Sequence, residues 1–123
     1  MKSNDGLHYF IKLVNQWRDQ YHTDLKHNII FQNKQTMTNV RFTNNSMHKI
    51  GDHSRGVDDL PDTIQEPDEI WARWEDVKTQ RIVLRNYVRG KYIVQTRDGL
   101  ITDAFLTNNA NKYRTGVMII VGK

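Results

Sequence analysis

The sequence predicts an α+β domain in which one or more N-terminal helices pack on a twisted antiparallel β-sheet. Two patterns carry this prediction. Apolar residues recur every three or four positions over residues 5–21, which is the period of an amphipathic helix. From residue 81 onward, β-branched and aromatic residues dominate, and turns containing glycine divide the chain into short strands. A helix followed by a run of neighbouring strands is typical of the α+β class.

The length and composition indicate a single folded domain over residues 1–123. Domains typically hold about 100–150 residues, so the chain has room for one hydrophobic core. Its longest apolar run, Val117–Val121, is far shorter than the roughly 20 residues that a membrane span needs. Because cysteine is absent, disulfides, thiolate metal sites and cysteine nucleophiles are excluded.

The first half of the chain predicts a helix, a hairpin and a second, short helix. Asn4 and Asp5 are good N-caps for the first helix, whose apolar stripe is expected in the core: Leu7, Phe10, Ile11, Val14, Trp17 and Tyr21. Residues 27–31 and 36–43 are expected to pair as a hairpin around a polar turn. Residues 44–46 then offer a cap for a short helix that ends near Gly56.

The second half predicts short helical turns and then a β-meander. Pro61 and Pro67 can each open a helical turn, and the second turn is expected to run through Ile70, Trp71 and Trp74. Turns at Arg89-Gly90 and Asp98-Gly99 separate the strands that follow. The predicted strands are residues 81–88, 91–96, 100–107 and 116–121.

Charge is distributed unevenly along a chain of net charge +4 and pI near 9.4. Residues 58–70 hold six acids and no base, whereas residues 71–123 hold ten bases and four acids. A basic block attracts polyanions and releases counterions from them. An ordinary solvated surface is the alternative, and we interpret the acidic segment as a solvated loop rather than an internal screen.

The basic block alternates with aromatic residues, as expected of a surface for single-stranded RNA. The RNA phosphates would contact the lysine and arginine side chains of the block, while the nucleobases would stack on the aromatic rings. The alternative for Tyr87 and Tyr92 is that they cover the edge of the core. The predicted RNA-binding residues are Arg55, Tyr87, Arg89, Lys91, Tyr92, Arg97 and Thr107.

Histidine, arginine and threonine together suffice for RNA cleavage without a metal. A base takes the 2′-hydroxyl proton, an acid protonates the leaving 5′-oxygen, and a cation or hydroxyl group holds the phosphorane. His53, Arg85 and Thr102 are the candidates, although a strand threonine can simply reflect β-propensity. His48 and His53 would point about 140° apart on a helix, which makes them a poor metal pair, and no nucleotide-cofactor motif is present. No metal or cofactor is therefore expected.

The order of these segments resembles the barnase/EndoU/colicin/RelE-like ribonuclease superfamily. The resemblance covers about residues 45–107 and rests on three segments. They are Met-His-Lys-Ile-Gly-Asp-His at 47–53, Leu-Pro-Asp-Thr-Ile-Gln-Glu-Pro-Asp-Glu-Ile-Trp at 60–71, and Leu-Ile-Thr-Asp-Ala-Phe at 100–105. The closest variety occurs at the C-termini of phage head-morphogenesis proteins and of contact-dependent or polymorphic toxins.

The resemblance implies a metal-independent endoribonuclease, with many members cutting tRNA and with the active site on the open face of the sheet. It makes His53 or His48 the helix histidine, Arg85 the sheet cation and Thr102 the late-strand hydroxyl. A toxin member would act in the bacterial cytoplasm, as the C-terminal part of a larger secreted or phage protein, and would bind an immunity protein. The alternative is a non-catalytic RNA-binding or virion-interaction module of the same fold.

Overall fold

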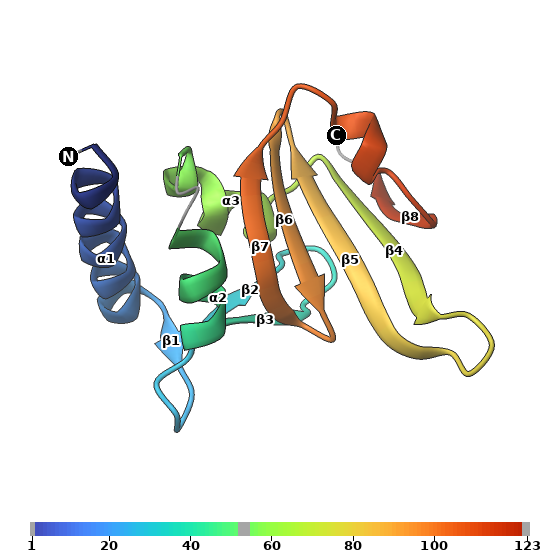
Figure 1. Ribbon diagram of the computed structural model, residues 1–123. Helices are drawn as coiled ribbons and strands as arrows, with labels where there is room; N and C mark the ends of the chain where they lie inside the picture. Colours follow the sequence, from blue (N-terminus) through green and yellow to red (C-terminus); the bar gives the residue numbers. More distant parts are fainter. Residues whose placement is uncertain (1, 52–54, 122–123) are drawn as a thin grey trace.

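The structure is a computed structural model that describes residues 2–51 and 55–121 (Figure 1). In this part of the chain, eight strands form one sheet in the order β1-β2-β3-β7-β6-β5-β4-β8. The helical elements are α1 (Lys2–Gln20), α2 (Asn44–Ile50), α3 (Leu60–Gln65) and the 3-10 turns η2 (Val57–Asp59) and η3 (Ala110–Tyr113). The strands are β1 (His22–Thr23), β2 (Ile29–Gln32), β3 (Asn39–Phe42), β4 (Glu69–Asp76), β5 (Arg81–Arg89), β6 (Tyr92–Arg97), β7 (Leu100–Leu106) and β8 (Val117–Val121).

The α+β class is confirmed, and strands β4 to β7 form the antiparallel meander at its centre. The N-terminal strands β1, β2 and β3 pair with one another and join the meander through one parallel register pair, Arg41 with Leu100. Figure 1 shows α1, α2 and α3 gathered on the β7 side, while the β4–β5 hairpin reaches away from them. None of the helices in the described ranges is long and apolar enough to cross a membrane.

The predicted helical turn through Ile70, Trp71 and Trp74 is wrong, because these residues lie in β4. Ile70 pairs with Tyr87 of β5 and is fully buried, so pairing along the whole hairpin outweighs the local signal of Pro67. Pro61 lies in the first turn of α3, as predicted.

The short helix α2 begins as a capped helix but ends earlier than predicted. Its N-cap is Thr43, whose side chain accepts a hydrogen bond from the Ser46 backbone, while the Ser46 side chain accepts one from the Thr43 backbone. The helix ends at Ile50 rather than near Gly56. Gly56 has a φ of 76° and precedes η2.

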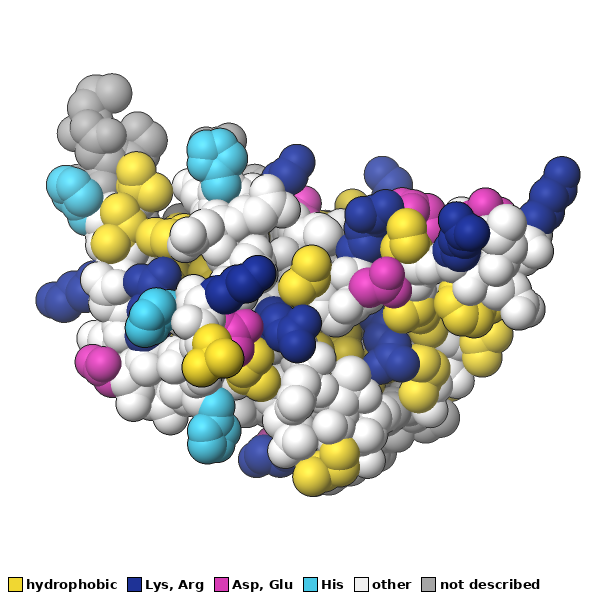
Figure 2. All heavy atoms as spheres, turned by 90° about the horizontal axis from the view of Figure 1, so that it is seen from below, with side chains coloured by type: hydrophobic (Ala, Val, Ile, Leu, Met, Phe, Trp, Pro, Cys, Tyr) yellow, Lys and Arg dark blue, Asp and Glu magenta, His cyan; other side chains and the backbone are white. Residues whose placement is uncertain are grey.

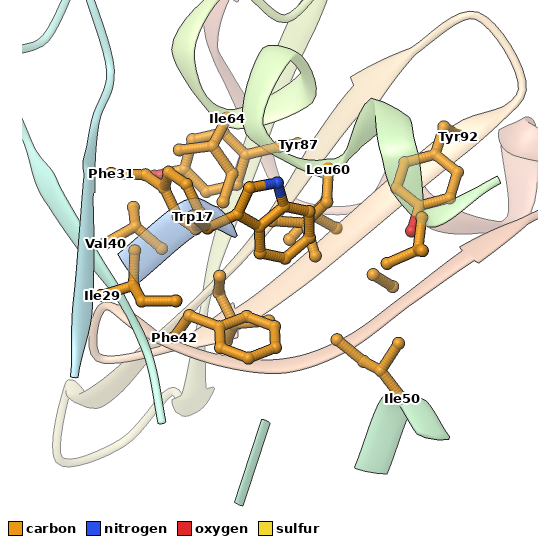
Figure 3. Close-up of a cluster of buried hydrophobic side chains, with 14 of the residues drawn as sticks. Trp17, Ile29, Phe31, Val40, Phe42, Ile50, Leu60, Ile64, Tyr87 and Tyr92 are labelled. Atoms are coloured by element: carbon orange, nitrogen blue, oxygen red, sulfur yellow. The ribbon is translucent and has the colours of Figure 1, made fainter. Parts of the chain in front are cut away.

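The core lies between one face of the meander, here called the inner face, and the elements packed on it. Ile70, Tyr87, Val94 and Ala104 point to this face and are buried. Figure 3 shows Trp17 of α1 within the cluster, and its ring meets Phe31 and Phe42 edge-on at centroid distances of 5.7 and 5.6 Å. Because side chains alternate along a strand, the residues between the inner-face positions lie on the opposite, outer face.

Candidate nucleic-acid interface

Arg85 lies on the inner face of β5, where the core gives way to a hollow of about 260 Å³. Its cross-strand partners are Ala72 of β4 and Thr96 of β6. Strand alternation places Arg85 two positions from the fully buried Tyr87, on the same face. The residues that line this inner hollow are Thr38, Asn39, Val83, Arg85, Tyr87, Asp98 and Gly99.

Several buried polar atoms around Arg85 have no hydrogen-bond partner in the described part of the protein. They are Nε and Nη1 of Arg85, the phenol oxygen of Tyr87 and Oγ1 of Thr96. Burial raises the pKa of Tyr87, against the opposing effect of the Arg85 guanidinium. The phenol therefore stays protonated and can donate at neutral pH. Arg85 and Tyr87 line the inner hollow and supply hydrogen-bond donors to it, whereas Thr96, the third residue of this donor cluster, lies opposite Arg85 on β6. A buried donor left without an acceptor costs about 1–3 kcal/mol, so the hollow is suited to an oxyanion.

The β6–β7 turn forms a rigid rim beside the donor cluster. Asp98 has a φ of 50°, and its backbone N–H donates to the Val83 carbonyl at 2.9 Å. In return the Val83 N–H donates to Oδ1 of Asp98 at 2.9 Å. Gly99, with a φ of 79°, passes close to the Asn39 carbonyl. These contacts hold the turn against β5 and β3, so the rim of the hollow is set by backbone hydrogen bonds.

Thr102 lies on the other side of this rim, in an outer hollow of about 210 Å³. A register shift after Gln95 turns Thr102 outward, and its hydroxyl donates to the Gln95 carbonyl at 3.3 Å. The residues that line the outer hollow are Thr43, Asn45, Arg97, Asp98, Leu100 and Thr102. Arg85 and Thr102, predicted to act together, thus line different hollows, which meet at Asp98.

Of the two predicted catalytic histidines, the structure describes only His48. Its exposed side chain lies on α2, one helical turn after Asn45, which lines the outer hollow. The Ser46 hydroxyl donates to the Ile101 carbonyl and so holds α2 against β7. His53 lies outside the described residues.

For Tyr87 and Tyr92 the structure agrees with the alternative to stacking, which is that the rings pack at the edge of the core. Their side chains are 0% and 2% exposed and belong to the hydrophobic core (Figure 3). Burial, together with Asp59, Asp103 and Asp58, raises the pKa of Tyr92. The inner face of the meander turns both rings into the core, which leaves neither face of either ring open to a nucleobase.

The predicted phosphate-binding cations lie in different places. Arg89 and Lys91 line a third hollow of about 300 Å³ at the opposite end of β5, with Arg89 3.8 Å from Asp62. Arg97 projects from the outer face and pairs with Glu75 at 2.9 Å. Figure 2, a view from the end that holds the β6–β7 turn, shows Lys and Arg side chains spread among hydrophobic ones.

Arg55 and Thr107, the remaining predicted RNA-binding residues, stand apart from the donor cluster. Arg55 is exposed in the turn before η2. Thr107 follows β7, and its hydroxyl accepts a hydrogen bond from the Asn109 N–H at 3.0 Å. Within the described ranges, no group of three or more histidine, aspartate or glutamate side chains could hold a metal ion.

Thr96 is a member of the donor cluster that the sequence interpretation missed. The turn at Arg89-Gly90 contained the signal, because Arg89 pairs with Tyr92 across it. Counting the antiparallel register back from that pair places Thr96 opposite Arg85.

The family of the chain was identified by comparison with known families. Residues 15–120 match the model of the family described as phage-Barnase-EndoU-ColicinE5/D-RelE like nuclease2. The chain belongs to this family. The match confirms the resemblance seen over residues 45–107 and extends it from α1 to β8. A comparison with curated proteins and one with solved structures find no match.

Proposed function

We propose that this domain is a metal-independent endoribonuclease that holds an RNA phosphate at the donor cluster of Arg85, Tyr87 and Thr96. Membership of a nuclease-like family supports the reaction class. RNA is the favoured nucleic acid because its 2′-hydroxyl can serve as the nucleophile, so cleavage needs only an acid–base pair and a group that stabilises negative charge.

The unsatisfied donors around Arg85 carry the proposal. A phosphate bound there would accept hydrogen bonds from the guanidinium and from the two hydroxyl groups. A guanidinium that is partly buried is worth more to a developing negative charge than one in water, because the surroundings screen it less. Arg85 is therefore assigned to stabilising the phosphorane.

The acid–base step is assigned to a histidine, with His53 first and His48 second. Both precede η2 in the chain, and an imidazole side chain can act as either a general acid or a general base. Thr102 is assigned a supporting role. Its position in the outer hollow requires the RNA strand to pass the Asp98 rim if Thr102 and Arg85 contact the same substrate.

The proposed physiological setting follows the toxin members of the superfamily. The substrate would be tRNA in the bacterial cytoplasm, the domain would be delivered as part of a larger secreted or phage protein, and an immunity protein would neutralise it. Support for this setting comes only from the resemblance and from the phage association of the matched family.

A second candidate function is a non-catalytic RNA-binding or virion-interaction module. The placement of Arg85 and Thr102 in different hollows favours it, because a binding module needs no convergence of catalytic groups. The donor cluster would serve phosphate binding equally well in such a module.

Incubation of the purified domain with total tRNA in EDTA separates the two functions. The nuclease yields fragments with 2′,3′-cyclic phosphate ends, and Arg85→Met abolishes them. The binding module leaves the RNA intact but retards it in a gel, again in a manner that depends on Arg85. Intact RNA without retardation contradicts both functions.

A further inference from the structure

An apolar shelf lies beside the donor cluster on the inner face of the sheet. It consists of Ala72 and Trp74 of β4, Val83 of β5 and Val117 of β8, and we call it the Trp74 shelf. Register pairs join Trp74 to Val83 and Ala72 to Val117, so all four side chains point to the same face. The β4–β5 hairpin reaches away from the helices (Figure 1), and Trp74 and Val117 remain 42% and 70% exposed.

Trp74 differs from the other two tryptophans of the chain. Trp17 is buried in the core at 3% exposure. The Trp71 indole N–H donates to Glu69 at 2.8 Å on the outer face. Trp74 does not belong to the core cluster of the described residues, and its cross-strand partner Val83 lines the inner hollow.

The spacing between Trp74 and Arg85 suits the two ends of one nucleotide. Arg85 pairs with Ala72, two residues from Trp74, so Arg85 and Trp74 are diagonal neighbours on adjacent strands. Such neighbours lie about 7–8 Å apart, within reach of long side chains. The shelf thus adjoins hydrogen-bond donors that could hold a phosphate, and a nucleotide combines an aromatic base with a phosphate.

We infer that Trp74 stacks on the nucleobase next to the phosphate held at Arg85, and that the substrate is therefore a single-stranded RNA segment with an unstacked base. This inference rests on the proposed function and specifies its substrate class. A base within a duplex is already stacked on its neighbours and cannot lie on the shelf. The stacking contact that was expected of Tyr87 and Tyr92 falls instead to a residue that was expected in a helix.

Binding of a short single-stranded RNA to Trp74 variants tests the inference. Trp74→Ala is expected to weaken binding roughly 5- to 150-fold, the usual effect of removing one stacking ring. The slope of affinity against salt should not change, since no phosphate contact is lost. Trp74→Phe keeps a ring and should stay near wild type. Val77→Ala, which removes another exposed apolar side chain of the same hairpin, is the matched control and should have no effect.

Single abasic substitutions along the RNA provide the complementary half of the test. One position should weaken binding to the wild type and leave binding to Trp74→Ala unchanged, because the stacking pair is already lost in that variant. If every abasic position costs both proteins the same, Trp74 does not stack. If wild-type protein binds no RNA at all, the proposed function fails, and the inference fails with it.

Intrinsic fluorescence keeps the test decisive even if Trp74→Ala does not fold. RNA should quench the emission of the wild type and of Trp71→Phe, because both retain Trp74. It should not quench Trp74→Phe. Quenching that persists in Trp74→Phe overturns the inference.

Discussion

Arg85 and Thr96 face each other across the β5–β6 pair, and the buried Nε and Nη1 of Arg85 and Oγ1 of Thr96 have no hydrogen-bond partner within the described residues. Burying such groups without partners destabilises the fold by an amount comparable to a lost hydrogen bond for each group. A bound phosphate would recover that free energy. Arg85 is therefore expected to lower the stability of the free protein while it favours phosphate binding.

Arg85→Met tests that opposition. The substitution keeps the aliphatic stem and removes the unsatisfied donors, so the free energy of unfolding should stay unchanged or rise by about 1 kcal/mol. RNA binding should weaken, and its salt slope should fall by nearly one unit for the lost phosphate contact. Urea unfolding and binding titrations at several salt concentrations measure both effects. Destabilisation of Arg85→Met by 2 kcal/mol or more, relative to the exposed Arg73→Met, would show that Arg85 is structural.

His53→Ala should lower the cleavage rate by roughly 10²–10⁴-fold if His53 is the acid or base. RNA affinity and melting temperature should change little, because only a transition-state contact is removed. His48→Ala should cost less. The measurement is single-turnover cleavage of a labelled RNA. The reverse order of effects would transfer the role to His48, which lies one helical turn from the outer hollow.

Asn33→Ala should destabilise the fold by about 3 kcal/mol, since several buried hydrogen bonds end on this side chain. Its Nδ2 donates to the Ile64 carbonyl at 2.8 Å, and its Oδ1 accepts from the backbone of Gln35 and Thr36 at 3.0 and 2.8 Å. The side chain therefore ties the β2–β3 turn to α3. Urea unfolding compares this variant with the exposed neighbour Gln32→Ala, which should differ from wild type by less than about 1 kcal/mol.

Glu69 should make the fold sensitive to acid. Hydrogen bonds from the Trp71 indole and the Arg114 guanidinium hold the pKa of its carboxyl below the ordinary 4.5. A carboxyl with a lowered folded pKa contributes stability above its ordinary value, and that stability is lost as pH falls through the folded pKa. Unfolding free energies measured from pH 6 down to pH 3 should therefore fall less steeply in Glu69→Gln. Identical slopes for both proteins would assign the acid sensitivity to other carboxyls.

The elements that local pattern determines were predictable from the sequence. The amphipathic period located α1, and the glycine turns located β5, β6 and β7 to within a residue or two. Local pattern was insufficient for β4. Trp71 and Trp74 were predicted in a helical turn, but they form a strand because they pair with β5. Local pattern was insufficient again for the face of each strand, so the sequence left open whether Tyr87 and Tyr92 stack on RNA or cover the core, and only the shared buried face with Ile70 and Val94 decides for the core.

The candidate site was predictable only in part for the same reason. Arg85 was identified from its residue type, but its free donors depend on the register that places Thr96 opposite it. The separation of Arg85 from Thr102 depends on the register shift after Gln95, and no local sequence motif predicts that shift. Non-local pairing decides both points.

The single parallel register pair between Arg41 and Leu100 has a consequence for how the chain folds. Each hairpin of the meander closes over a short turn, so β4 to β7 can assemble by successive local steps of low entropic cost. Joining β3 to β7 must instead close a long stretch of chain for one register pair. The other contacts of this part, from α2 to β7 and from Asn33 to α3, also join segments that are far apart in the sequence. We therefore expect the N-terminal third to dock last, onto a meander that is already formed. We also expect it to detach first when the protein unfolds.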